Sequence, residues 1–194
     1  MTEVAARRMP MTVSDYLAFA DAHPRQRFEL LSGTAVATVP GTLRHSLIAG
    51  NINSVLRRQA RDRGCQSLAD AGVSMGEDAE FFAQPDVMVR CGPMDGRRRW
   101  ASDPLVIVEV LSPSTMADDR GDKLQCYLRD FPSLRHVALV DQDECRIEDW
   151  GRADEGSWPE DGAQVPRPPE AVLDLAAIGA SLPLAEAYED VTFD

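Results

Sequence analysis

The feature that most constrains the fold is a continuous apolar run in the middle of the chain, interrupted by a single acidic residue. Residues 105–111 read Leu-Val-Ile-Val-Glu-Val-Leu, and Ser112-Pro113 ends the run. A short run this rich in β-branched residues predicts a central strand that is buried on both faces. Burying the carboxylate of Glu109 in such a strand is costly unless a cation or hydrogen-bond donors compensate it. The strand therefore predicts a polar partner beside it.

The patterning around this strand predicts a mixed α/β fold. Apolar residues recur at helical spacing over 12–22, 43–63 and 115–130, and capping boxes are expected at Thr12–Asp15 and Thr115–Asp118. Strand patterning predicts a hairpin over 27–39 and further strands over 66–75, 80–90, 134–140 and 145–150. Two apolar pieces over 171–188 are expected to pack back on the domain. This order is typical of a mixed β-sheet flanked by helices.

Composition is that of a globular protein. The 194 residues fit one domain, which we expect over 12–194 after a flexible leader of residues 1–11. No apolar stretch approaches the ~20 residues of a membrane span, and the first residues lack the apolar centre of a secretion signal. The four cysteines show neither metal-site nor disulfide-framework spacing. We therefore expect reduced thiols and a cytoplasmic location.

The net charge of −12 argues against a protein that holds nucleic acid by its overall electrostatics. Arginines nevertheless cluster, which leaves room for a locally basic cleft or for solvated surface. The clusters are Arg25 and Arg27; Arg57, Arg58, Arg61 and Arg63; and Arg97, Arg98 and Arg99. Only one of the 20 basic residues is a lysine, Lys123, and it follows Glu109 on the next predicted helix.

Two carboxylates and this lysine have the composition of a metal-dependent phosphodiesterase site. Asp86, in Gln84-Pro85-Asp86-Val87, and Glu109 lie on two candidate core strands. Their carboxylates and the carbonyl of Val110 are oxygen ligands of the kind that Mg²⁺ prefers. Bound Mg²⁺ would polarise a phosphate oxygen and acidify a water, and the Lys123 ammonium would orient that water or stabilise developing negative charge.

Each of these residues also has an ordinary structural explanation. Glu109 could pair with an arginine, and Asp86 follows a proline, as is common in turns. Lys123 lies four residues after Asp119, a spacing that gives a simple helical ion pair. The three residues together carry more weight than any one of them.

Several motifs, taken in order, resemble the Uma family of "putative restriction endonucleases", a bacterial branch of the PD-(D/E)XK nuclease superfamily. The resemblance covers nearly the whole chain, from about Thr12 to Asp194. Its most specific part is Glu-Val-Leu-Ser-Pro-Ser-Thr from Glu109, followed by Asp-Arg-Gly-Asp-Lys from Asp119. The matching segments lie at 28–33, 84–89, 108–115, 119–127, 137–141 and 181–188.

The resemblance implies a restriction-endonuclease-like core in which Asp86 and Glu109 hold Mg²⁺, for which Mn²⁺ can substitute. The wider superfamily places its lysine two residues after the glutamate, where this chain has Leu111. In the Uma-like branch the lysine is expected from the following helix, and Lys123 stands there. The match therefore implies Lys123 as the catalytic lysine.

The resemblance also implies further site residues. Glu29 matches the family's Glu-Leu motif and is implied as another acidic catalytic residue, with a solvated hairpin residue as the alternative. His45, Gln84 and Tyr127 are implied to line the site. His45 could instead simply open the long helix, and Tyr127 could belong to the core.

These inferences predict a Mg²⁺-dependent endonuclease that hydrolyses phosphodiester bonds, with DNA as the expected substrate. A homodimer is compatible with this function because paired cuts in a duplex need two sites. Two alternatives stay open. A non-catalytic metal-binding or interaction protein on the same fold would suit the acidic charge and the lack of a DNA-reading module. A small phosphoester hydrolase would suit the charge too, but the chain lacks the usual glycine-rich phosphate cradle.

Overall fold

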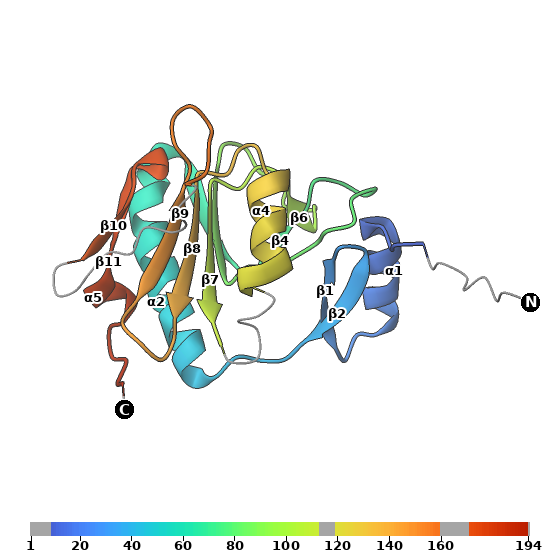
Figure 1. The fold of residues 1–194 in the computed structure, drawn as a ribbon, viewed down its shortest axis with the longest axis horizontal. Helices are drawn as coiled ribbons and strands as arrows, with labels where there is room; N and C mark the ends of the chain where they lie inside the picture. Colours follow the sequence, from blue (N-terminus) through green and yellow to red (C-terminus); the bar gives the residue numbers. More distant parts are fainter. Residues whose placement is uncertain (1–8, 113–118, 160–170, 194) are drawn as a thin grey trace, which may run out of the picture.

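The computed structural model describes residues 9–112, 119–159 and 171–193, and its centre is a five-stranded mixed sheet (Figure 1). The strand order is β3-β5-β7-β8-β9. Only β7 and β8 run parallel, and the other neighbours are antiparallel. The strands are β3 (Cys65–Ala69), β5 (Val87–Cys91), β7 (Val106–Leu111), β8 (His136–Asp141) and β9 (Ile147–Gly151). The predicted apolar run is thus the middle strand, β7, and the predicted mixed sheet is confirmed.

Helices cover both faces of this sheet because side chains alternate along each strand. Val106, Val108 and Val110 of β7 pack in a core with the long helix α2 (Leu43–Ala60). Ile107 and Leu111 point the other way, into a core with α4 (Leu124–Asp130). Glu109 therefore lies on the α4 face. The α2 face is completed by the hairpin β10 (Val172–Leu175) and β11 (Ala180–Pro183), with η3 (Ala176–Ile178) between them and α5 (Leu184–Ala187) after them.

An amino-terminal unit packs beside this sheet. It consists of α1 (Val13–Ala22) and the hairpin β1 (Arg27–Leu31) and β2 (Thr34–Thr38), which turns at Ser32-Gly33 as predicted. The capping box at Thr12 is confirmed, since its hydroxyl accepts from the Asp15 amide while the Asp15 carboxylate accepts from the Thr12 amide. Leu30 pairs with Phe82, which ties β1 to the segment leading into β5.

Two predicted elements are shorter than their patterns indicated. The strand expected over 80–90 begins only at Val87, because the residues before it form isolated bridges to Leu30 and Val73 instead of one ladder. The strand expected over 66–75 divides into β3 and β4 (Gly72–Val73), and β4 pairs with β6 (Trp100–Ala101) in the loop after β5.

The helix expected over 115–130 is also interrupted. A helical segment η2 (Asp119–Lys123) precedes α4 and kinks at Gly121, whose φ of −98° and ψ of −118° are not helical. The capping box expected at 115–118 and most of the expected leader lie outside the described residues. The helix expected over 43–63 is confirmed as α2 plus the short η1 (Arg61–Arg63), and Gly64 ends it in a left-handed conformation. Within the described residues, no helix has both the length and the hydropathy that a bilayer crossing requires.

The cysteine prediction is wrong for one pair. Cys65 of β3 and Cys91 of β5 lie directly opposite each other across the antiparallel ladder and form a disulfide, whereas Cys126 and Cys145 are free. The two positions are 26 residues apart in the sequence. Spacing alone could not reveal the pair because the register of two strands brings it together.

Replacing both Cys65 and Cys91 with alanine is expected to lower the free energy of unfolding by about 3 kcal/mol, the loop-closure contribution of a bridge of this span. Urea unfolding of the oxidised protein and of the double variant measures this difference. Under non-reducing denaturation we expect two reactive thiols in the wild type. Four reactive thiols, with unchanged stability in the variant, would mean that the bridge does not form.

Candidate active site

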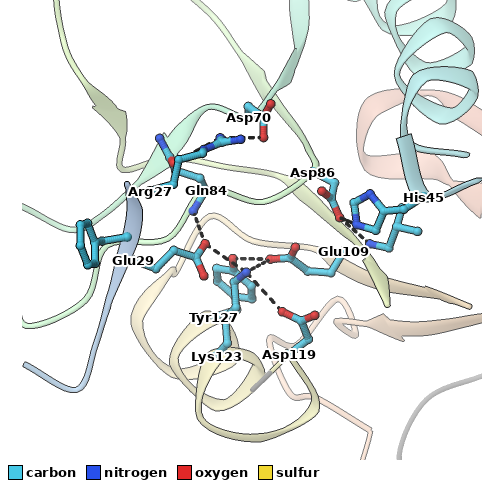
Figure 2. A network of polar contacts seen from close by, with 12 residues as sticks. Arg27, Glu29, His45, Asp70, Gln84, Asp86, Glu109, Asp119, Lys123 and Tyr127 are labelled. Atoms are coloured by element: carbon cyan, nitrogen blue, oxygen red, sulfur yellow. Dashed lines mark hydrogen bonds and ion pairs between the residues drawn. The ribbon is translucent and has the colours of Figure 1, made fainter. Parts of the chain in front are cut away.

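A pocket of about 400 Å³ opens beside the carboxyl end of β7, between the start of α2 and the hairpin β1–β2. Most of the predicted site residues line it. They are Glu29, His45, Gln84, Asp86, Glu109, Val110 and Lys123. Figure 2 shows the side chains of Glu29, Glu109 and Lys123 meeting from β1, β7 and the segment before α4, with Asp86 beside His45 of α2.

Lys123 lies at the centre of a buried ionic network. Its Nζ is 2.9 Å from Oε1 of Glu109, 3.1 Å from Oε1 of Glu29 and 3.3 Å from Oδ1 of Asp119. All four side chains are at most a tenth exposed. Burial alone would lower the pKa of Lys123, but the carboxylates of Glu109, Glu29 and Asp119 together raise it above its ordinary value. Lys123 is therefore a positively charged donor and not a base.

Two further hydrogen bonds fix the glutamates in this network. The hydroxyl of Tyr127 donates to Oε1 of Glu109 at 2.6 Å, and the backbone N–H of Gln84 donates to Oε1 of Glu29 at 2.7 Å. Tyr127 is on α4, one helical turn after Lys123, and its side chain is 1% exposed. It does not line the pocket and contacts Glu109 from the protein core. Burial, followed by the negative charge of Glu109, raises the pKa of Tyr127 well above its ordinary value, so the phenol stays protonated.

Asp86 is held by contacts outside the Lys123 network. It directly precedes β5, and the register pairs its neighbour Val87 with Val108 on β7. Its Oδ2 accepts from the amide of Val110 at 2.7 Å and lies 3.3 Å from Nε2 of His45, which is in the first turn of α2. The contact with Asp86 raises the pKa of His45, although burial opposes it, and a backbone hydrogen bond with Val110 adds to the increase.

Glycine before α2 makes room for this histidine. A Cβ on Gly41 would lie 2.7 Å from Cγ of His45, closer than side-chain atoms pack. The hydroxyl of Thr42 caps the helix by accepting from the His45 amide. The imidazole is thereby directed toward Asp86 by the local geometry of the helix start.

The pocket carries an excess of negative charge. Burial raises the pKa of Glu109 well above its ordinary value; Lys123 opposes this, while the charges of Asp119, Asp86 and Glu29 add to it. With every group counted as ionised, including the imidazole, acidic side chains outnumber basic ones by two formal charges. The acidic side chains are Glu29, Asp70, Asp86, Glu109 and Asp119, and the basic ones are Arg27, His45 and Lys123.

This donor set fits a hard divalent cation. In the described contacts only one oxygen of Asp86 and one of Glu109 are engaged, so the second oxygen of each is available to a cation. No three His, Cys, Asp or Glu side chains among the described residues form a ready cluster for a metal. Two carboxylates, supplemented by a backbone carbonyl, water and substrate oxygens, match the way in which Mg²⁺ is usually held.

The sequence did not predict one member of the network or the rim beside it. Asp119 looked like the partner of an ordinary helical ion pair, but it is 4% exposed and faces the pocket. Its place as the first residue of the Asp-Arg-Gly-Asp-Lys motif was the available signal. At the rim, Nη2 of Arg27 lies 3.1 Å from Oδ1 of Asp70 and 3.5 Å from Oε1 of Gln84. No sequence pattern indicated that Arg27 and Asp70 would meet.

A family model described as "Putative restriction endonuclease", Uma2, matches residues 13–185, which is most of the chain. The chain belongs to this family. The resemblance inferred from the motifs is therefore confirmed, and the pocket contains residues from four of the six matching segments.

Relatives match the Uma2 chain over almost its full length. The uncharacterized protein slr1290 of Synechocystis is 27% identical over 185 residues, which cover 94% of each chain. A second Synechocystis protein, sll1609, is 25% identical and covers 80% of this chain and 88% of its own length.

A solved structure from Anabaena variabilis, described as a putative nuclease belonging to DUF820, superposes with a TM-score of 0.74. The match covers 94% of this chain and all of the Anabaena chain, at 16% sequence identity. At that level of identity the similarity shows the fold alone, a mixed β-sheet flanked by helices as predicted.

Proposed function

We propose that this protein is a divalent-metal-dependent endonuclease that hydrolyses phosphodiester bonds in DNA. The observation that carries the proposal is one pocket in which Asp86 and Glu109 lie near a buried, positively charged Lys123. The lining of this pocket has two more formal negative charges than positive ones. Membership of the Uma2 family supports a nuclease, and the charge excess supports the metal.

In this proposal Asp86 and Glu109, together with the carbonyl of Val110, hold Mg²⁺ or Mn²⁺. When bound, the cation would polarise a phosphate oxygen and acidify a water. His45 keeps Asp86 oriented, and Tyr127 and Gln84 do the same for Glu109 and Glu29. These second contacts set the positions of the ligand oxygens.

Lys123 acts as a charged donor toward the scissile phosphate. Because its pKa is raised, it holds its proton and can stabilise negative charge that develops on the phosphate oxygens. Glu29 and Asp119 hold the ammonium beside Glu109. The net reaction adds water across one P–O bond and yields a phosphate monoester and a hydroxyl group, so no further reactant is required.

Plasmid nicking in Mg²⁺ or Mn²⁺ tests this function. We expect wild-type protein to nick and Asp86→Asn to lose at least about 100-fold in rate, since it removes a charge that supports the transition state. The matched control is Asp174→Asn, which neutralises an exposed carboxylate on β10 outside the pocket and is expected to nick normally. Equal rates for wild type and Asp86→Asn would contradict the assignment. Metal binding without nicking would point to a non-catalytic role for the same site.

A further inference from the structure

A second hollow, of about 580 Å³, adjoins the candidate active site. Asp70 and Gln84 line both pockets, so the two are adjacent at the rim where Arg27 contacts Asp70. The outer wall of the second pocket is the loop between β5 and β6, which contains the run Arg97-Arg98-Arg99. Its volume is within the ~300–1,000 Å³ typical of small-molecule sites.

This pocket lacks the negative excess of the first, because three arginines (Arg90, Arg98 and Arg99) and three aspartates (Asp70, Asp95 and Asp103) line it. Four guanidinium groups around it are already paired with carboxylates, and Arg98 is left over. The pairs are Arg27 with Asp70, Arg90 with Asp103, Arg97 with Asp95, and Arg99 with Asp21. In the described part of the chain, no carboxylate lies within ion-pair distance of Arg98, which is exposed and lines the pocket. A guanidinium without a carboxylate partner can bind an anion, although the chain as a whole has a net charge of −12.

Part of the second pocket is apolar. Met88 is buried at its base, Met94 is 52% exposed, and Trp100 is half-buried. A guanidinium beside an aromatic and two thioethers can bind a phosphate and, next to it, the flat face of a base. An inorganic anion such as sulfate has no base and would contact only the guanidinium, so the apolar wall favours a nucleotide.

We propose that the second pocket is a substrate subsite, in which Arg98 binds the phosphate of the nucleotide that flanks the scissile bond and the wall at Trp100 takes its base. This inference rests on the proposed function, because the subsite is defined relative to the phosphate held beside Lys123. The two pockets share Asp70 and Gln84 in their linings, so one strand bound at Lys123 would extend toward Arg98.

The test is the binding of a fluorescein-labelled single-stranded DNA oligonucleotide in Ca²⁺, followed by fluorescence anisotropy over a series of salt concentrations. We expect Arg98→Ala to weaken binding about tenfold, the contribution of one charge-assisted hydrogen bond. The slope of log K against log salt should fall by about 0.7, the value for one single-strand phosphate contact. Arg98→Lys should recover most of the slope. The control is Arg57→Ala, since Arg57 is exposed on α2 and lines neither pocket.

The outcomes separate this inference from the proposed function. If Arg98→Ala and Arg57→Ala have the same affinity and salt slope while wild type still nicks DNA, the subsite is wrong and the nuclease stands. If wild type binds through Arg98 but does not nick, Arg98 is a DNA contact, the nuclease proposal fails, and the pocket is not a subsite beside a scissile bond. If wild type neither binds the oligonucleotide nor nicks, both fail.

Discussion

Replacing Lys123 with methionine is expected to lower the free energy of unfolding in metal-free buffer by about 3–5 kcal/mol, the usual cost of removing one partner from a buried charge network. Methionine fills similar space, but it leaves Glu29, Glu109 and Asp119 buried together without a cation. Chemical unfolding at neutral pH measures the loss. Added Mg²⁺ should restore part of the stability, since binding to the folded state alone stabilises it.

The same variant should bind metal and fail to nick DNA, because the ligand oxygens stay and the charged donor is lost. Arg58→Met is the matched control. It breaks the exposed ion pair with Glu186, whose side chains are 61% and 45% exposed, so it should cost less than about 1 kcal/mol. Normal nicking by Lys123→Met would remove Lys123 from the mechanism.

Replacing Glu109 with glutamine is expected to increase stability progressively as the pH rises above about 4.5 in metal-free buffer. Burial and neighbouring carboxylates raise the pKa of Glu109 in the folded protein, whereas the unfolded chain ionises near its ordinary value of 4.5. Its contribution to stability is therefore complete below that value and is lost as the pH rises toward the folded pKa. The loss is at most about 1.4 kcal/mol per pH unit. Glutamine keeps an acceptor for Tyr127 and carries no charge, so it removes this loss.

Urea unfolding of the wild type and of Glu109→Gln between pH 5 and pH 9 measures the difference. The stability gain of the variant should grow with pH and should disappear when Mg²⁺ is added to saturation, because only the wild type is then stabilised. A variant that becomes less stable than the wild type as the pH rises would show that the ion pair with Lys123 outweighs the burial of Glu109.

Local patterns predicted the elements that depend on local chemistry. The capping box at Thr12, the turn at Ser32-Gly33 and the helix ended by Gly64 all involve neighbouring residues, and all are confirmed. The face of Glu109 also followed from strand alternation, because Ile107 and Leu111 pack with it on the α4 side. In the candidate site, the family motif predicted that Lys123 would lie near Glu109.

The structural features that could not be predicted from the sequence depend on contacts between segments distant in the chain. Cys65 and Cys91 meet only because β3 and β5 pair in one register. The strand expected from Glu80 is cut short because Phe82 bridges to β1, which is distant in sequence. Asp119 is buried in one network with Glu29, which is distant in sequence, and lies in a helical segment whose non-helical Gly121 the pattern did not predict. Each of these features depends on which elements pack together, and hydrophobic periodicity does not predict that.

The most direct test of the central claim is calorimetric titration of Mg²⁺ and Mn²⁺ into wild type, Asp86→Asn and Glu109→Gln, with plasmid nicking measured on the same samples. We expect a saturable metal-binding heat and nicking in the wild type, and the loss of both in each variant. No metal binding by the wild type, or the same binding in all three proteins, would contradict a metal site at Asp86 and Glu109.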